Sequence, residues 1–510
     1  MTTRTRAVAC AFLLLVALAF RLVLATTMPN DEPDDAHGYT LLARNLLAHG
    51  AYSLSSTPPL EPTYARVPGY PLLIAAIYRV SGVDNDTAVR VAQAVIETAT
   101  CWSIACLALA LVPDAWPCRR RWRVQCAALG LAAVCPFTAI YVTTVLTEVL
   151  AISLGTATAW FAMRALRESA DDGGARGRRR PWRWWFAAGL AGGALTIVRP
   201  EGGLLAAGAG ATMVLAAVWR WWRARKSGSA QAAARLVGSS VLLALGFLAC
   251  DGPWIIRNMS VFGVFQPIAP PGAAMPEDFT TPGYVRWLMT WMDEPKYVGP
   301  FQFNLDRVRF SIDQLPPGAI ESPDERRLVA ELFSQYNGGE PDQRPSPGTS
   351  ANAPAGMTRA LDARFDTLAW ERIRRHPIRY YLSLPVERVF WMWAGTHSQY
   401  YPFDGDLLPL ANLNREMGQH IWLPIFALLT LAWTLVGMAG AMRLISEPSS
   451  RVGLVLLFML VVPRLALLGA IASPEPRYLV QLFPFLSALG GVMIGSAWSR
   501  WGDGEVIRLR

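Results

Sequence analysis

Charged residues are scarce in this sequence, and their scarcity sets the class of protein. Only 17% of the 510 residues are charged, whereas 53% are hydrophobic and 20 are Trp. Together with a positive mean hydropathy, this composition is typical of a polytopic membrane protein rather than a soluble one. The net charge of +9 is then explained by membrane orientation. It gives no reason to expect a nucleic-acid partner.

Several signatures of other protein classes are missing. The five His show no HExxH spacing, and the seven Cys show no metal-type spacing. We find neither a Gly-rich phosphate loop nor a repeat of about 20–50 residues. These absences give no support to a zinc enzyme, a nucleotide-binding loop or a solenoid.

Ten hydrophobic segments are candidates for membrane-spanning helices, each of which needs roughly 20 mostly apolar residues. They are residues 7–26, 86–112, 124–140, 142–163, 184–199, 201–219, 236–256, 419–442, 452–472 and 477–498, and the stretch 124–163 also permits a different division. Arg4 and Arg6 precede the first segment, and Arg-rich loops follow the second, fourth and sixth. The positive-inside rule therefore predicts that these loops are cytoplasmic.

Two long segments remain on the outer side, residues 27–85 and 257–418. None of the Cys residues lies in either segment, so we expect both to fold without disulfides. The predicted domains are an N-terminal transmembrane module at 1–256, which includes the loop 27–85, an outer region at 257–418, and C-terminal helices at 419–510. Residues 338–356 are rich in Gly, Pro, Ser and Asn, and we expect a flexible linker there.

Ionisable residues of the predicted spans concentrate toward the outer side. Such residues are costly in a membrane and by default indicate function. Those in outer halves or at outer ends are Arg21, Glu97, Glu148, Arg199, Glu201, Asp251, Arg257, His420, Arg464 and Arg477. This one-sided distribution predicts a polar cavity that opens outward and disfavours an alternating-access carrier with a midplane site. The alternative is that these side chains snorkel or form pairs that orient helices.

A carboxylate pair, Asp34 and Asp35, lies just beyond the first span. Either residue can cap a surface helix that runs to about residue 48, and Asp35 and Tyr39 then share one face of it. A carboxylate at this position can meet a lipid-borne substrate and water together. The alternative interpretation is that both acids only cap the helix.

Seven short motifs carry a family resemblance through their order and their topological placement. They are Asp35-Ala36-His37-Gly38-Tyr39, Ala43-Arg44-Asn45-Leu46, Arg66-Val67-Pro68-Gly69-Tyr70-Pro71, Thr147-Glu148, Arg199-Pro200-Glu201-Gly202, Pro253-Trp254-Ile255-Ile256-Arg257-Asn258 and Pro476-Arg477-Tyr478. With them the chain resembles the GT-C glycosyltransferase superfamily, in particular the bacterial dolichyl-phosphate-mannose–protein mannosyltransferase-like enzymes and the aminoarabinose transferases. The resemblance covers the N-terminal half well and residues 260–420 poorly.

The resemblance implies an all-α, GT-C-like bundle of about 10–13 transmembrane helices, with periplasmic surface helices and a small periplasmic helical region. It implies inverting transfer of a hexose or pentose from a polyprenyl-phosphate donor to a hydroxyl acceptor at the periplasmic face of a bacterial inner membrane. Asp35 would then be the general base. The expected substrate-binding residues are Tyr39, Arg66, Glu148, Arg257, Arg464 and Arg477.

The expected roles follow the chemistry of the donor. Arginines suit the charge that develops on a lipid phosphate leaving group. Glu148 would orient the acceptor or hold an arginine, and its alternative is a buried ion pair. We expect no resident cofactor, since a monophosphate donor needs less neutralisation than a diphosphate. A divalent cation, if one is used, would be held near Asp34, Asp35 and His37. The rival functions are a lipid or solute transporter, a polymerase or ligase of lipid-diphosphate-linked glycans, and a non-catalytic assembly partner.

Overall fold

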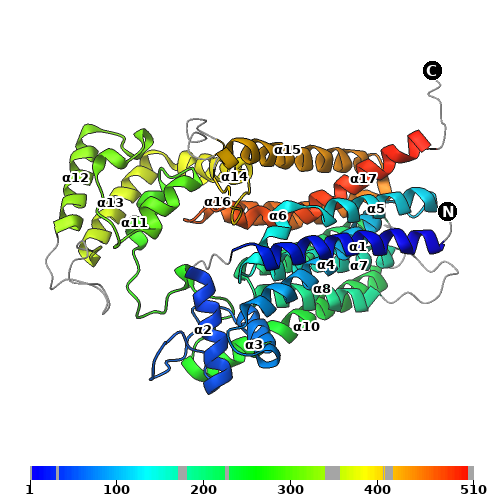
Figure 1. The fold of residues 1–510 in the computed structure, drawn as a ribbon, viewed down its shortest axis with the longest axis horizontal. Coiled ribbons are helices and arrows are strands. Elements are labelled where there is room, and N and C mark those ends of the chain that lie inside the picture. Colours follow the sequence, from blue (N-terminus) through cyan, green and yellow to red (C-terminus); the bar gives the residue numbers. More distant parts are fainter. Residues whose placement is uncertain are drawn as a thin grey trace. The chain divides into compact units, whose positions relative to one another are not determined.

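The fold is helical throughout the part of the chain that the structure describes. The computed structural model describes residues 3–29, 34–170, 181–223, 229–338, 356–405, 407 and 417–502, and one isolated β-bridge, between Ser53 and Pro62, is the only extended pairing in these ranges (Figure 1). The predicted all-α polytopic fold is confirmed. Residues 339–355 of the expected linker lie outside the described residues.

Eight helices among the described residues are long and apolar enough to cross a membrane, and one bent pair makes a ninth candidate. The eight are α1 (Thr3–Thr27), α4 (Asp86–Leu111), α7 (Glu148–Ala170), α9 (Gly203–Arg223), α10 (Ser229–Phe262), α15 (Met417–Ile445), α16 (Arg451–Ala470) and α17 (Phe483–Gly502). The bent pair is α5 (Cys118–Ala133) followed by α6 (Pro136–Ala139) and the 3-10 turn η1 (Ile140–Thr143). The remaining expected span, 184–199, corresponds to α8 (Pro181–Thr196), whose 16 residues fall short of a full crossing.

The chain divides into two compact units, each described by itself. Unit 1 comprises Met1–Ala273, Thr396–Arg464 and Val480–Arg510. Unit 2 comprises Ala274–Gly395 and Leu465–Leu479. Unit 2 contains α11 (Pro282–Met289), α12 (Pro323–Gly338), α13 (Arg359–Arg375), α14 (Leu384–Ala394) and the last turn of α16. Its aromatic core, which includes Tyr284, Trp287, Phe333 and Phe365, is formed by α11, α12, α13 and the segments between them.

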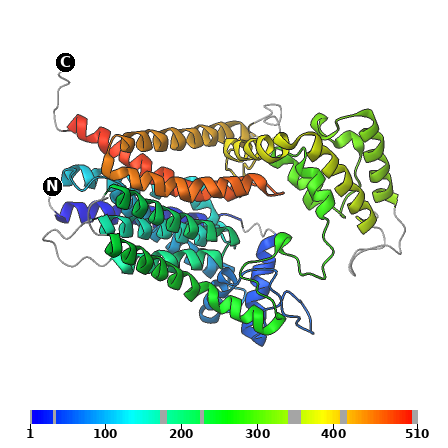
Figure 2. The same ribbon diagram turned by 180° about the vertical axis from the view of Figure 1, so that it is seen from behind.

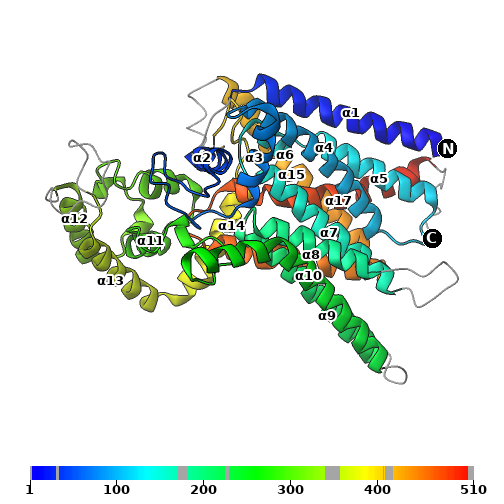
Figure 3. The ribbon, with the colours of Figure 1, turned by 90° about the horizontal axis from the view of Figure 1, so that it is seen from below.

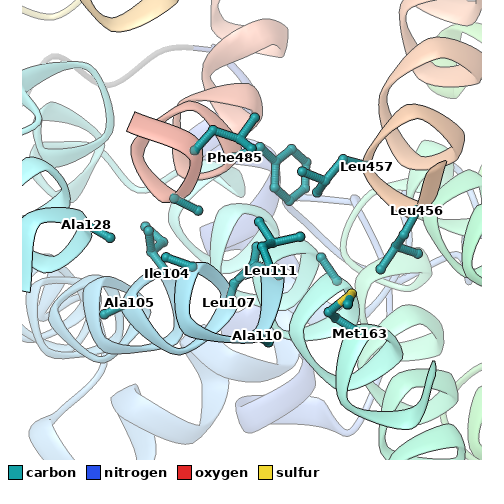
Figure 4. Packing of buried hydrophobic residues seen from close by; sticks show 14 of the residues in the cluster. Ile104, Ala105, Leu107, Ala110, Leu111, Ala128, Met163, Leu456, Leu457 and Phe485 are labelled. Atoms are coloured by element: carbon teal, nitrogen blue, oxygen red, sulfur yellow. The ribbon is translucent and has the colours of Figure 1, made fainter. Parts of the chain in front are cut away.

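The helices of unit 1 pack around one hydrophobic core. Ile104 and Leu107 of α4 meet Leu457 of α16 and Phe485 of α17 in this core (Figure 4). Glycines allow close contact between helices, since a Cβ on Gly491 of α17 would come within 2.5 Å of the Ala128 Cβ on α5. Figure 3 shows α1 and α9 at opposite margins of this unit.

The bend between α5 and α6 has a clear physical cause. Pro136 has no N–H, so the carbonyl of Ala132 loses its donor four residues on and keeps a long bond from the Cys135 N–H at 3.4 Å. Arg21 of α1 supplies the missing donors, with Nη2 at 3.0 Å from the Ala132 oxygen and Nη1 at 2.9 Å from the Ala133 oxygen. Its guanidinium also pairs with Glu97 of α4, and both side chains are buried. Arg21 and Glu97, two of the ionisable residues expected in the spans, therefore stabilise a broken helix.

Basic side chains gather at one end of unit 1. The Trp116 ring, in the loop between α4 and α5, lies 3.4 Å from the Arg120 guanidinium carbon and 5.5 Å from that of Arg443. Nearby, Arg123 donates to the Trp498 carbonyl at 3.2 Å. Among the described residues, the basic loop between α4 and α5 thus meets Arg443 of α15 and the end of α17 at one end of the bundle.

Two shorter helices, α2 (Asp34–His49) and α3 (Gly69–Ser81), lie at the other end of the bundle. They pack against each other through Ala36, Ala43, Tyr70 and Ile74. Figures 1 and 2 show α2 running across the direction of the spanning helices. Both are too short to span, and the segment between them forms a loop that carries part of the candidate site.

Candidate active site

Asp35 lies in the first turn of α2, where a carboxylate is favoured by the helix dipole. Its Oδ1 accepts a hydrogen bond from Arg66 Nη2 at 2.8 Å. The side chains of Asp35 and Arg66 keep 29% and 33% of their surface exposed, so this ion pair is accessible from outside the protein. The Arg66 guanidinium carbon also lies 5.7 Å from the centroid of the Tyr39 ring. Three of the expected site residues are therefore in direct contact.

Arg66 is held by the loop that joins α2 to α3. The Tyr52 hydroxyl donates to the Arg66 carbonyl at 3.0 Å. At the end of the loop, the Gly69 N–H donates to the Ile197 carbonyl at 2.6 Å, and a Cβ on Gly69 would come within 2.7 Å of that oxygen. Only glycine fits this approach. The start of α3 is therefore fixed against Ile197, which lies two positions before Arg199 in the sequence.

Arg257, near the end of α10, fastens the same loop. Its Nη1 donates to the Thr63 carbonyl at 2.8 Å. Its guanidinium carbon lies 5.5, 5.0 and 5.1 Å from the ring centroids of Tyr52, Trp254 and Phe262, respectively, an arrangement that stabilises the cation. In this structure Arg257 therefore holds the loop that carries Arg66. Its expected contact with phosphate stays a prediction.

A chain of buried charges lies beside the start of α7. Glu148 Oε1 accepts a hydrogen bond from Arg199 Nη1 at 2.9 Å. Arg199 Nε lies 2.6 Å from Glu201 Oε1, and the same oxygen lies 3.6 Å from Arg464 Nη2. Carboxylates and guanidiniums thus alternate from Glu148 to Arg464, which offsets the cost of burying each charge. The alternative weighed for Glu148, a buried ion pair, is present.

Tyr39 lies within electrostatic reach of both groups of residues. Burial is the main reason that the pKa of Tyr39 rises to about 12, and the carboxylates of Asp35 and Glu148 act in the same direction. The guanidiniums of Arg66 and Arg199 oppose this shift. At neutral pH the Tyr39 phenol is therefore protonated and able to donate a hydrogen bond. The Asp35–Arg66 pair and the Glu148–Arg199 pair therefore lie in one region, because both influence the Tyr39 phenol.

The other two expected arginines differ in their surroundings. Arg464 is only 2% exposed and, with Gln481, lines a narrow cavity between apolar side chains. Arg477 belongs to unit 2, where its Nη2 donates to Glu475 Oε1 at 3.2 Å. Their roles as phosphate ligands stay predictions. Among the described side chains, no group of three or more His, Cys, Asp and Glu is arranged to hold a metal ion.

Arg199, Glu201 and Gly69 occur in the motifs, but the sequence assigned them no role. The signal for Arg199 and Glu201 was their opposite charge at the outer end of a span. Nothing in the sequence indicates that Arg199 bridges two carboxylates, because Glu148 lies 51 positions away.

A family model provides independent support for the resemblance. Residues 62–244 match the dolichyl-phosphate-mannose-protein mannosyltransferase family. This part of the chain belongs to that family. The mannosyltransferase-family module, residues 62–244, contains Arg66, Glu148, Arg199 and Glu201, whereas Asp35 precedes it. The resemblance to GT-C glycosyltransferases is thereby confirmed.

Comparisons with whole proteins extend beyond the mannosyltransferase-family module. No curated protein sequence matches the chain. The structure is similar to oligosaccharyltransferase AglB from Archaeoglobus fulgidus, in complex with an inhibitory peptide and a dolichol-phosphate, with a TM-score of 0.47, 13% identity, and coverage of 98% of this chain and 52% of that chain. It is also similar to ArnT from Cupriavidus metallidurans bound to undecaprenyl phosphate, with a TM-score of 0.38, 12% identity, and coverage of 96% and 78%. The chain thus spans about half the length of the archaeal enzyme.

Proposed function

We propose that this chain is an inverting glycosyltransferase that moves a sugar from a polyprenyl-phosphate donor to a hydroxyl acceptor. The observation that carries the proposal is the partly exposed Asp35–Arg66 pair, next to the mannosyltransferase-family module. ArnT, to which the chain is similar, was solved with undecaprenyl phosphate. That lipid has the chemistry expected of the product that remains after the sugar leaves.

In the proposed reaction, Asp35 is the general base. The acceptor hydroxyl gives its proton to the Asp35 carboxylate while its oxygen attacks the anomeric carbon. The bond between that carbon and the phosphate oxygen breaks, and the electron pair leaves with the polyprenyl phosphate. A single displacement inverts the anomeric centre and needs no enzyme nucleophile.

Positive side chains at the site suit the leaving group. The Arg66 guanidinium is exposed enough to reach a phosphate oxygen while it holds Asp35. Preorganised donors of this kind stabilise charge that develops in the transition state. The Glu148–Arg199 pair, whose side chains are 1% and 13% exposed, would fix the geometry of the residues around Tyr39.

We also propose that the reaction takes place at the periplasmic face of a bacterial inner membrane. The basic side chains of the α4–α5 loop and Arg443 of α15 gather at the end of unit 1 remote from α2 (Figure 1), and the positive-inside rule would put that end in the cytoplasm. The candidate site would then face outward. Cysteine labelling of Arg44→Cys in intact cells would test this orientation, since Arg44 is exposed on α2.

The donor class is tested with purified protein in proteoliposomes. The protein would be offered a sugar on polyprenyl monophosphate, the same sugar on polyprenyl diphosphate, or a sugar nucleotide. We expect sugar-dependent release of polyprenyl phosphate from the first donor alone. Turnover of only the diphosphate donor would favour the glycan polymerase or ligase, and transport without bond cleavage would favour the carrier.

A further inference from the structure

A helix of unit 2 leaves an apolar face uncovered. On α14, Leu384, Arg388 and Met392 are buried at a spacing of four residues. Positions two residues away point to the opposite side of a helix. The side chains on and before that opposite face are apolar and 60–72% exposed: Ile378, Tyr381, Leu382, Val386 and Phe390. We refer to these five residues as the apolar stripe.

The inward face of α14 is fastened to the end of a membrane span. Arg388 Nη1 donates to the Gly469 carbonyl at 3.0 Å. A Cβ on Gly469 would come within 2.5 Å of the Pro385 carbonyl oxygen, so the two backbones are in close contact. Gly469 lies in the last turn of α16, within the candidate span Pro448–Ala470. Thus α14 is fastened to the part of α16 that belongs to unit 2.

The charges next to the apolar stripe are mainly basic. Arg374, Arg375 and Arg379 are exposed just before or within the stripe, and the exposed acids nearby are Glu371 and Glu387. Arg375 is partly engaged by Glu321 at 3.4 Å. An apolar face flanked by arginines matches the interface between acyl chains and anionic headgroups.

We propose that the apolar stripe is a docking surface for the phospholipid bilayer. Its five side chains would lie among the upper acyl chains, with Arg374 and Arg379 at the level of the lipid phosphates. This inference is independent of the proposed transfer reaction. Its consequence is that the helical part of unit 2 rests on the membrane surface instead of projecting freely into the outer compartment.

Spin labels on the full-length protein in proteoliposomes of phosphatidylethanolamine and phosphatidylglycerol test the proposal. The background carries Ser in place of the three cysteines that are not buried, Cys106, Cys118 and Cys250. Single labels are placed by Leu382→Cys and Val386→Cys. The matched control is Arg327→Cys on α12, whose side chain is 81% exposed.

We expect labels at positions 382 and 386 to collide more with oxygen than with a water-soluble nickel chelate, and the label at 327 to show the reverse. Equal water accessibility at all three positions would overturn the proposal. Exclusion of both reagents from 382 and 386, with an immobilised spectrum, would also overturn it, because a protein surface such as a second copy would then cover the stripe.

Discussion

The Asp35 carboxylate and the Arg66 guanidinium form a hydrogen-bonded ion pair at 2.8 Å, although 31 positions separate them in the sequence. The pair joins the first turn of α2 to the loop before α3. It remains partly exposed, while the charges around Glu148 are buried. An accessible acid with a fixed cation beside it is what proton removal at a phosphate-linked sugar requires.

Arg66→Ala should reduce turnover by about 10²–10³-fold, since it removes a preorganised donor from the developing phosphate charge. Arg66→Lys should recover part of the rate, because it keeps the charge and loses the planar fork. The measurement is the initial rate of polyprenyl phosphate release. Arg44→Ala, which breaks the exposed pair with Asp84 on the same side of unit 1, is the control and should have near-normal activity. An Arg66→Ala enzyme as active as the Arg44→Ala enzyme would contradict the assigned role.

Arg257→Lys should loosen the loop 52–66 while the positive charge is kept. The fork of Arg257 binds the Thr63 carbonyl and lies among three aromatic rings, and hydrogen bonds to charged groups contribute about 1.5–3 kcal/mol. We expect faster hydrogen exchange in residues 52–66 and a loss of roughly tenfold or more in rate. Arg79→Lys, at an exposed position of α3, should change neither. Unchanged exchange with a higher KM for the donor would instead support direct phosphate binding by Arg257.

Glu201→Gln should destabilise unit 1, because Arg199 and Arg464 would lose the carboxylate between them. Removing one member of a buried ion pair costs about 3–5 kcal/mol, which should appear as a lower Tm in detergent. Glu447→Gln removes a partly exposed partner of Arg443 and should cost about 0–1 kcal/mol. Equal Tm values for the two variants would refute the stabilising role of the buried chain.

Arg21→Leu should lower the Tm more than the double substitution Arg21→Leu/Glu97→Leu. The single change leaves Glu97 buried without its cation and removes the donors to the Ala132 and Ala133 carbonyls. The double change removes the unpaired charge as well, so part of the stability should return. If the double variant lowered the Tm as much as Arg21→Leu or more, the predicted coupling between Arg21 and Glu97 would be contradicted.

Local patterns were enough to predict much of the fold. Each of the ten apolar segments has a helix in the structure, and the acids at 34 and 35 begin α2, which runs to His49. Both results depend on periodicity and capping within a few residues. The stretch 124–163, which the sequence allowed to be divided in two ways, contains a broken helix. Pro136 lacks the backbone N–H that the helix needs, and Arg21 of another helix supplies a donor in its place.

The contacts of the candidate site could not be predicted in the same way. The sequence selected Asp35, Tyr39, Arg66 and Glu148, but their partners depend on tertiary structure. Arg199 bridges two carboxylates only because α7 and α8 are packed together. Arg257 looked like a phosphate ligand from its charge and position, and its aromatic surroundings appear only when α10 meets the loop. Charge and position predict where polar groups gather, whereas their pairing is decided by packing.

The most direct test of the central claim is the rate of sugar transfer by purified Asp35→Asn protein with a polyprenyl-phosphate sugar, beside Asp84→Asn as the matched control. Both changes remove the carboxylate of an Arg–Asp pair in the same outer segment. We predict that Asp35→Asn abolishes transfer at unchanged Tm and that Asp84→Asn keeps near-normal rates. Near-normal transfer by the Asp35→Asn protein would contradict the account.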